Sequence, residues 1–89
     1  MNANVELYIA RVEEACGAER DFIVLFKYDK KDEAVAKILK KAKIVRTITG
    51  ILDLAYRDVS FRLYVTGKAI FKKIKDKNEL NEILADLLS

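Results

Sequence analysis

The chain has 89 residues, of which 52% are apolar and 35% charged, and this composition argues against a disordered chain and for one folded domain over residues 1–89. It contains one cysteine, no histidine and no run of about 18 apolar residues. We therefore expect no intrachain disulfide, no metal site, no cofactor and no membrane span, in a protein of the cytoplasm.

The net charge of +3 is unevenly distributed along the chain. Residues 1–21 carry a net charge of −3, residues 22–77 carry +9, and residues 78–89 carry −3. A basic middle between acidic ends provides a field for an anionic partner, or it lets the charges compensate one another within the fold. The lack of Gln, Trp and Pro beside abundant Lys and Glu is typical of thermophile proteins.

The first predicted element is a helix over residues 4–16. Asn4 can cap it and Gly17 can end it. Apolar residues recur at helical spacing on one face, namely Val5, Tyr8, Ile9, Val12, Ala15 and Cys16. Since Cys16 belongs to this stripe, we expect a core thiol rather than a reactive one.

Residues 21–28 contain the apolar run FIVLF, which predicts a strand covered on both faces or nearly so. Asp29 can then cap a helix that continues to about residue 43. The buried stripe of this helix is expected to be Val35, Ile38, Leu39 and Ala42. Its lysines lie elsewhere and indicate a solvated face, with nucleic-acid contact as the alternative.

The segment 44–57 is ambiguous. β-Branched residues favour a strand over residues 44–49, and Gly50 interrupts it as a bulge or a turn. Residues 51–56 can form a strand or a short helix, and we favour the strand. Whether 44–57 makes one strand or two stays open at this stage.

The last third of the chain predicts a hairpin followed by a capped helix. In residues 59–66, Val59, Phe61, Leu63 and Val65 are expected on the core face, and the alternate residues on the other. Residues 66–68 form the turn. Asp76 and Glu79 make a capping box before the apolar stripe Leu80, Ile83, Leu84, Leu87 and Leu88.

These elements predict an α+β fold of order α-β-α-β-β-β-α. Helices packed on one face of a mostly antiparallel sheet form a two-layer sandwich, which is the natural arrangement for such an order.

Catalysis has little support in the sequence. Without histidine, a Ser or Cys nucleophile would need an unusual lysine or carboxylate as its base. Asp53 stands alone in an apolar run, so it is either a buried carboxylate with a shifted pKa or a residue at a turn or edge. The Thr66-Gly67-Lys68 triplet lacks the spacing of a phosphate-binding loop. We therefore expect a protein that is not an enzyme.

A basic surface is the remaining candidate site. The predicted sheet carries seven residues that could contact a partner, namely Arg46, Arg57, Arg62, Tyr64, Lys68, Lys72 and Lys73. Cations can neutralise phosphates and Tyr64 can stack on a base. No aromatic pair of the RNP type accompanies them, and Lys72 with Lys73 can instead protect an edge strand from pairing.

From residue 22 to residue 88 the chain resembles the small dimerisation subunits of the KEOPS tRNA-modification complex. The parallels are the strand FIVLF and the helix DEAVAK after it, the hairpin FRLYVTGK, and the terminal helix from Asp76. The hairpin and helix are also similar to half of a TATA-box-binding protein. The first resemblance implies a non-catalytic subunit that homodimerises through its sheet and holds the modifying enzyme with its helices. Its basic patch would then help to bind tRNA.

Two functions follow as expectations. The first is a non-catalytic assembly or adaptor protein that self-associates as a homodimer and binds a protein partner. The alternative is a small basic protein that binds RNA or DNA with its sheet face.

Overall fold

The computed structural model describes residues 3–14 and 21–89, and in these the fold is α+β, as predicted. Three helices and six strands follow one another as α1 (Ala3–Tyr8), β1 (Ile9–Glu14), β2 (Phe22–Phe26), α2 (Lys31–Lys41), β3 (Lys43–Ile48), β4 (Ile51–Tyr56), β5 (Val59–Tyr64), β6 (Lys68–Phe71) and α3 (Lys77–Leu87). None of these helices is long and apolar enough to cross a membrane.

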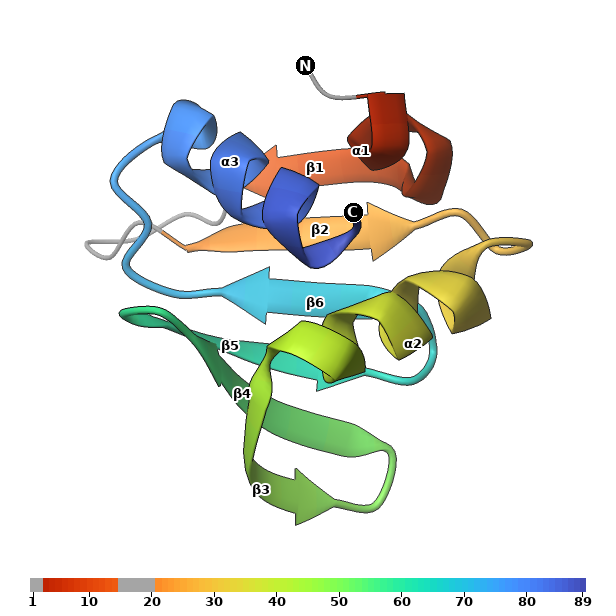
Figure 1. Cartoon of the computed structure of the whole chain (residues 1–89), viewed down its shortest axis with the longest axis vertical. Coiled ribbons are helices and arrows are strands. Elements are labelled where there is room, and N and C mark those ends of the chain that lie inside the picture. The colour runs from red at the N-terminus through yellow and green to blue at the C-terminus, as the bar shows by residue number, and fades with distance from the viewer. Residues whose placement is uncertain (1–2, 15–20) are drawn as a thin grey trace.

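All six strands belong to one antiparallel sheet of order β1-β2-β6-β5-β4-β3. The chain leaves β2, crosses the sheet as α2, and enters the far edge at β3. It then returns strand by strand until β6 pairs with β2 (Figure 1). The three helices lie on one face of this sheet, and the β3–β4 hairpin extends beyond them (Figure 1).

The core lies between the sheet and the helices. Strand residues that point to the helices are buried, and these include Phe22, Val24, Leu54, Leu63 and Ala69. Phe61 and Phe71 stack there with ring centroids 4.5 Å apart. No polar or charged residue is buried in the described part of the chain, so the core between the two layers is held by apolar packing.

The predicted helix over residues 4–16 is wrong beyond Tyr8, because residues 9–14 form the edge strand β1. The register shifts by one residue between Ile9 and Arg11, which marks a β-bulge. The bulge lets Ile9, opposite Phe26, and Val12, opposite Val24, point to the same side although they are three residues apart. The bulged strand therefore has apolar residues at the spacing that is typical of a helix, which explains why a helix was predicted here. Cys16 and Gly17 lie outside the described residues.

The second helix also differs at its N-terminus. Asp29 does not cap it, because α2 begins at Lys31 after the N-cap Lys30, which makes no side-chain capping bond. Lys43, predicted as its last residue, is instead the first residue of β3. Within α2, Ala34 and Ile38 are buried, and Val35 and Leu39 pack partly buried against the core.

The segment 44–57 forms two strands joined by a turn at Gly50, whose φ of +76° favours glycine. The predicted hairpin is confirmed, since β5 and β6 pair directly and Gly67 lies in their turn at φ +109°. Val65 was expected on the core face, but it follows the end of β5 and is 46% exposed.

The C-terminal helix agrees with its prediction. The Asp76 side chain caps α3 by accepting a hydrogen bond of 2.9 Å from the Glu79 backbone N–H. The predicted apolar stripe is buried in full, at Leu80, Ile83, Leu84, Leu87 and Leu88. This stripe accounts for the helix lying over the sheet.

Candidate functional site

The side of the sheet that faces away from the helices is uncovered in the chain as described. We call it the open face. Paired strand residues share a face, so the register defines its members. They are Arg11, Glu13, Ile23, Leu25, Lys43, Arg46, Ile48, Ile51, Asp53, Ala55, Ser60, Arg62, Tyr64, Lys68 and Ile70, and Lys72 extends the row of Ser60 through a backbone hydrogen bond.

FIVLF was predicted to be covered on both faces or nearly so, and only its helix-facing side is fully covered. In β2, Phe22, Val24 and Phe26 are buried by the helices, but Ile23 and Leu25 are only partly buried because nothing in the described chain packs on their side. Helices therefore cover only one of the two faces of the sheet. A patch of aliphatic side chains from β2 and β6 is consequently presented to solvent at the centre of the open face.

Both acids of the open face are paired with arginines on the same face. Glu13 lies 2.9 Å from Arg11, in an exposed ion pair. Asp53 accepts a hydrogen bond of 2.8 Å from Nε of Arg62, its cross-strand neighbour. This bond, with the charges of Arg62, Arg46 and Lys72, lowers the pKa of Asp53 and outweighs partial burial.

Four cations of the open face make no ion pair with any described residue: Lys43, Arg46, Lys68 and Lys72. The ammonium group of Lys68 lies 4.7 Å from the ring centroid of Tyr64, which is a cation–π distance. With both acids already neutralised, these cations give the open face a net positive charge. Such a surface attracts an anionic partner.

The structure brings together five of the seven candidate residues. Arg46, Arg62, Tyr64, Lys68 and Lys72 all lie on the open face, from β3 to the end of β6.

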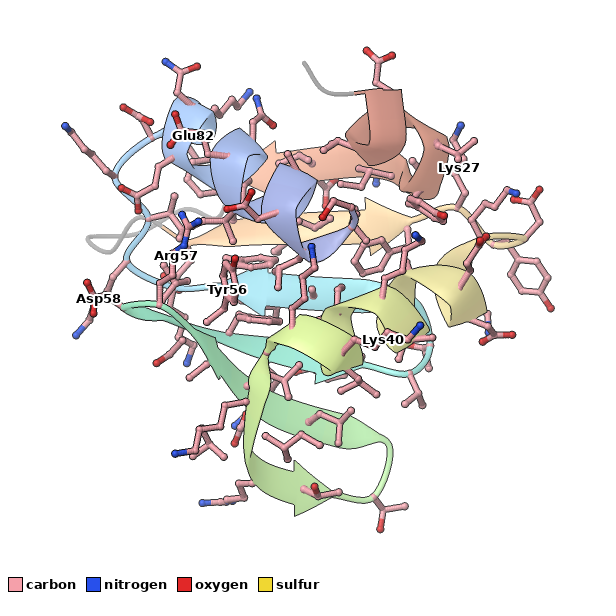
Figure 2. The ribbon with its side chains drawn as sticks, viewed as in Figure 1. Lys27, Lys40, Tyr56, Arg57, Asp58 and Glu82 are labelled. Atoms are coloured by element: carbon pink, nitrogen blue, oxygen red, sulfur yellow. The ribbon has the colours of Figure 1, made fainter. Side chains whose placement is uncertain are left out.

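Arg57 and Lys73 do not belong with them. Arg57 lies in the β4–β5 turn at φ +57° and forms an ion pair of 2.5 Å with Asp86 of α3. Figure 2 shows it beside α3, on the helix side of the sheet. Lys73 also has φ +57°, beyond the end of β6, and its backbone N–H donates to Asp21. Both residues lie outside the strands, so strand alternation does not determine the side on which they lie.

A hollow of about 230 Å³ lies beside the Asp53–Arg62 pair. Asp53 is the carboxylate that the sequence offers as a possible catalytic group, so its position beside a hollow has to be compared with the requirements of catalysis. The lowered pKa keeps Asp53 ionised and bound to Arg62, which is the opposite of a carboxylate held ready as a general base near neutral pH. Among the described residues no three potential metal ligands of the His, Cys, Asp or Glu type come together.

Sequence reasoning missed several members of the open face, above all Ile23, Leu25 and Lys43. FIVLF has no polar residue to mark its outer side, and Lys43 was counted within the second helix. The available signal was the strict alternation of β5, from which pairing carries the outward positions across the sheet.

No family model matches this chain, and neither a curated protein nor a solved structure is similar enough to count as a match. The open face is therefore the basis of the proposed function. The resemblance to the KEOPS subunits stays a prediction.

Proposed function

We propose that this protein is a non-catalytic binding module that holds a nucleic-acid strand on its open face. One observation carries the proposal: four cations without ion pairs to described residues lie on the uncovered side of the sheet, two on the edge strand β3 and two at the ends of β6, next to the aliphatic side chains of β2 and β6. The helix side also has cations without an ion pair to a described residue, such as Lys40 of α2, but there the acids Glu79 and Glu82 of α3 add negative charge and Arg57 is paired with Asp86.

The chemistry of the open face suits a phosphodiester chain. Lysine and arginine neutralise phosphates and release counterions, which supplies most of the non-specific affinity for nucleic acid. Tyr64 and the aliphatic side chains of Ile23 and Ile70 offer contacts to bases and sugars. Because Tyr64 is the sole aromatic residue among the members of the open face, we expect binding directed to the backbone with little sequence preference.

The edges of the sheet are less suited to binding than its face. β1 and β3, which form the edges, each contain a register shift, and each exposes charged residues such as Arg11 and Arg46. Bulges and charges on an edge strand discourage the addition of another strand. A partner is therefore expected on the face.

The test is fluorescence anisotropy with labelled oligonucleotides, single-stranded and duplex, of RNA and of DNA, over a range of salt concentrations. Four phosphate contacts predict a log–log slope of affinity against salt of about −3 to −4. Arg46→Ala should weaken binding and reduce this slope by about 1.

Lys40→Ala is the matched control. Lys40 is an exposed cation on α2, on the opposite side of the molecule (Figure 2). Its removal subtracts the same charge without touching the open face, so affinity should change little. Equal losses for Arg46→Ala and Lys40→Ala, or no binding at low salt, would contradict the proposal.

Self-association is a second candidate, favoured by the aliphatic patch of Ile23, Leu25 and Ile70. In this case the open faces of two copies pack together, as expected of a homodimeric adaptor that presents its helices to a protein partner. The four unpaired cations of each copy would then approach those of the other. Salt should strengthen such a dimer by screening, whereas it weakens nucleic-acid binding.

Sedimentation equilibrium at low and high salt separates the two candidates. A monomer at both salt concentrations supports the nucleic-acid proposal. A dimer that is stabilised by salt and lost in Ile70→Glu supports self-association, and the control Ala36→Glu, on an exposed position of α2, should leave the oligomeric state unchanged.

A further inference from the structure

We propose that the hollow beside β4 and β5 is the anchoring point for one phosphate group of the bound strand. This inference rests on the proposed function and assigns a specific place to one contact within it. The hollow is lined by Val45, Asp53, Leu54, Ser60, Phe61, Arg62 and Lys72.

The size of the hollow limits what it can hold. Its volume of about 230 Å³ is below the roughly 300–1,000 Å³ of sites that enclose drug-sized ligands. Leu54 and Phe61 are almost fully buried, so they close its floor, while the polar lining side chains point to the open face. A single phosphate with part of its sugar fits such a shallow site better than a whole cofactor does.

The polar lining is cationic. Lys72 is exposed and has no ion pair with a described residue. Arg62 is oriented by Asp53 through Nε, at 2.8 Å, and its second contact with that carboxylate is longer, at 3.5 Å. A guanidinium has five N–H donors, so this pairing fixes its position and leaves donors for a phosphate oxygen.

Further groups complete the donor set. The exposed Ser60 hydroxyl can donate to a phosphate oxygen. Arg46 lies directly opposite Asp53 on β3, which adds a cation next to the hollow.

A break in regular pairing occurs at this place. The register of β3 shifts between Ile44 and Arg46, so Val45 is the extra residue of a bulge, and Val45 lines the hollow. Bulges bend a strand and re-aim its side chains, and they are frequent next to functional sites. We infer that the bulge opens the space that a regular ladder would close.

The experiment is a titration of ¹⁵N-labelled protein with inorganic phosphate, at constant ionic strength maintained with chloride, followed by heteronuclear NMR. We expect saturable shifts at the backbone amides of Ser60, Arg62 and Lys72. In Lys72→Ala these shifts should require at least about tenfold more phosphate, since a charge-assisted bond is lost. Lys68→Ala, a cation on the same face but outside the lining, is the matched control and should leave the titration unchanged.

The same variants are then compared in the oligonucleotide assay. Lys72→Ala should weaken binding more than Lys68→Ala if one phosphate sits in the hollow. Binding at low salt with equal losses for both variants, and no saturable shift with phosphate, would overturn this inference and leave the proposed function intact. Phosphate binding in the hollow without any oligonucleotide affinity would overturn both, because the ligand would then be a free phosphate.

Discussion

The two faces of the sheet are built from alternate residues of the same strands, yet they differ in almost every physical property. On β6, Phe71 is fully buried beneath the helices, while its neighbour Ile70 is only partly buried on the open face. On β5, Leu63 belongs to the core, while Arg62 forms an ion pair with Asp53. One face provides the packed core, and the other exposes charged and aliphatic side chains to solvent.

The two faces also differ in how their charged side chains are paired. On the helix side, Arg57 and Lys41 tie neighbouring elements to the end of α3, through the Asp86 carboxylate and its backbone carbonyl. On the open face, both acids form ion pairs with arginines, and four cations have no ion pair with a described residue. The open face therefore has a surplus of positive charge that no described acid on that face neutralises, and the proposed function assigns this charge to the phosphates of a nucleic-acid strand.

The sharpest test of this comparison replaces the same residue type on each face. Leu63→Ala, on the covered face, should lower the free energy of unfolding by about 2–5 kcal/mol, because it leaves a cavity in a packed core. Leu25→Ala, on the open face, should cost about 1 kcal/mol, since its side chain is only partly buried. Urea denaturation of both variants measures the difference. A large cost for Leu25→Ala that grows with protein concentration would break the comparison and indicate a second copy on the open face.

Charge reversal compares the two faces in binding. Lys43→Glu places an acid on the open face and should reduce oligonucleotide affinity about tenfold at low salt, because it removes one phosphate contact and adds repulsion. Lys40→Glu makes the same change of net charge on α2 and should have a much smaller effect. Anisotropy titrations at one low salt concentration check this. Equal effects would mean that net charge matters and the face does not.

The covered face depends on its helices being formed. Asp76→Ala removes the side-chain cap of α3 and should lower the free energy of unfolding by about 1 kcal/mol. Glu82→Ala is the control, since Glu82 is an exposed residue of the same helix (Figure 2). Oligonucleotide affinity should stay unchanged in both variants. A loss of affinity in Asp76→Ala under conditions where it is folded would show that the two faces are coupled.

The smallest expected effect concerns pH. The pKa of Asp53 in the folded protein lies below its ordinary 3.8, chiefly because Arg62 donates to it. Its contribution to stability is thus complete above the unfolded pKa and is lost as the pH falls through the lower, folded value. Asp53→Asn should be less stable than wild type at neutral pH and approach it in strong acid. Thermal unfolding from pH 6 to pH 2 tests this, with the exposed Glu82→Gln as control, and a gap that is constant with pH would contradict it.

Local patterns predicted the second half of the chain well. The alternation of β5, the turn at Gly67, the cap at Asp76 and the stripe of α3 are all encoded within a few residues of one another. They could be read correctly because short-range sterics and hydrogen bonds determine them. The same alternation identified Arg62 and Tyr64 as outward residues, and with them the centre of the candidate site.

The first part of the chain was harder because its pattern is ambiguous. Ile9 and Val12 have helical spacing, and only the pairing of β1 with β2 and its bulge turns them into residues of one strand face. The coverage of Ile23 and Leu25 is likewise invisible in FIVLF, which is equally apolar on both sides. Coverage depends on where distant helices pack, and no local signal reports it.

The sequence alone determined the α+β class, the hairpin, the terminal helix and a basic, histidine-free chain, because each follows from local periodicity or from composition. Tertiary structure decided that all helices lie on one side and that the cations of β3, β5 and β6 share the other. It also separated Arg57 and Lys73 from that group. The reason is that a strand fixes only the alternation of its side chains, whereas the packing of distant elements decides which set is covered.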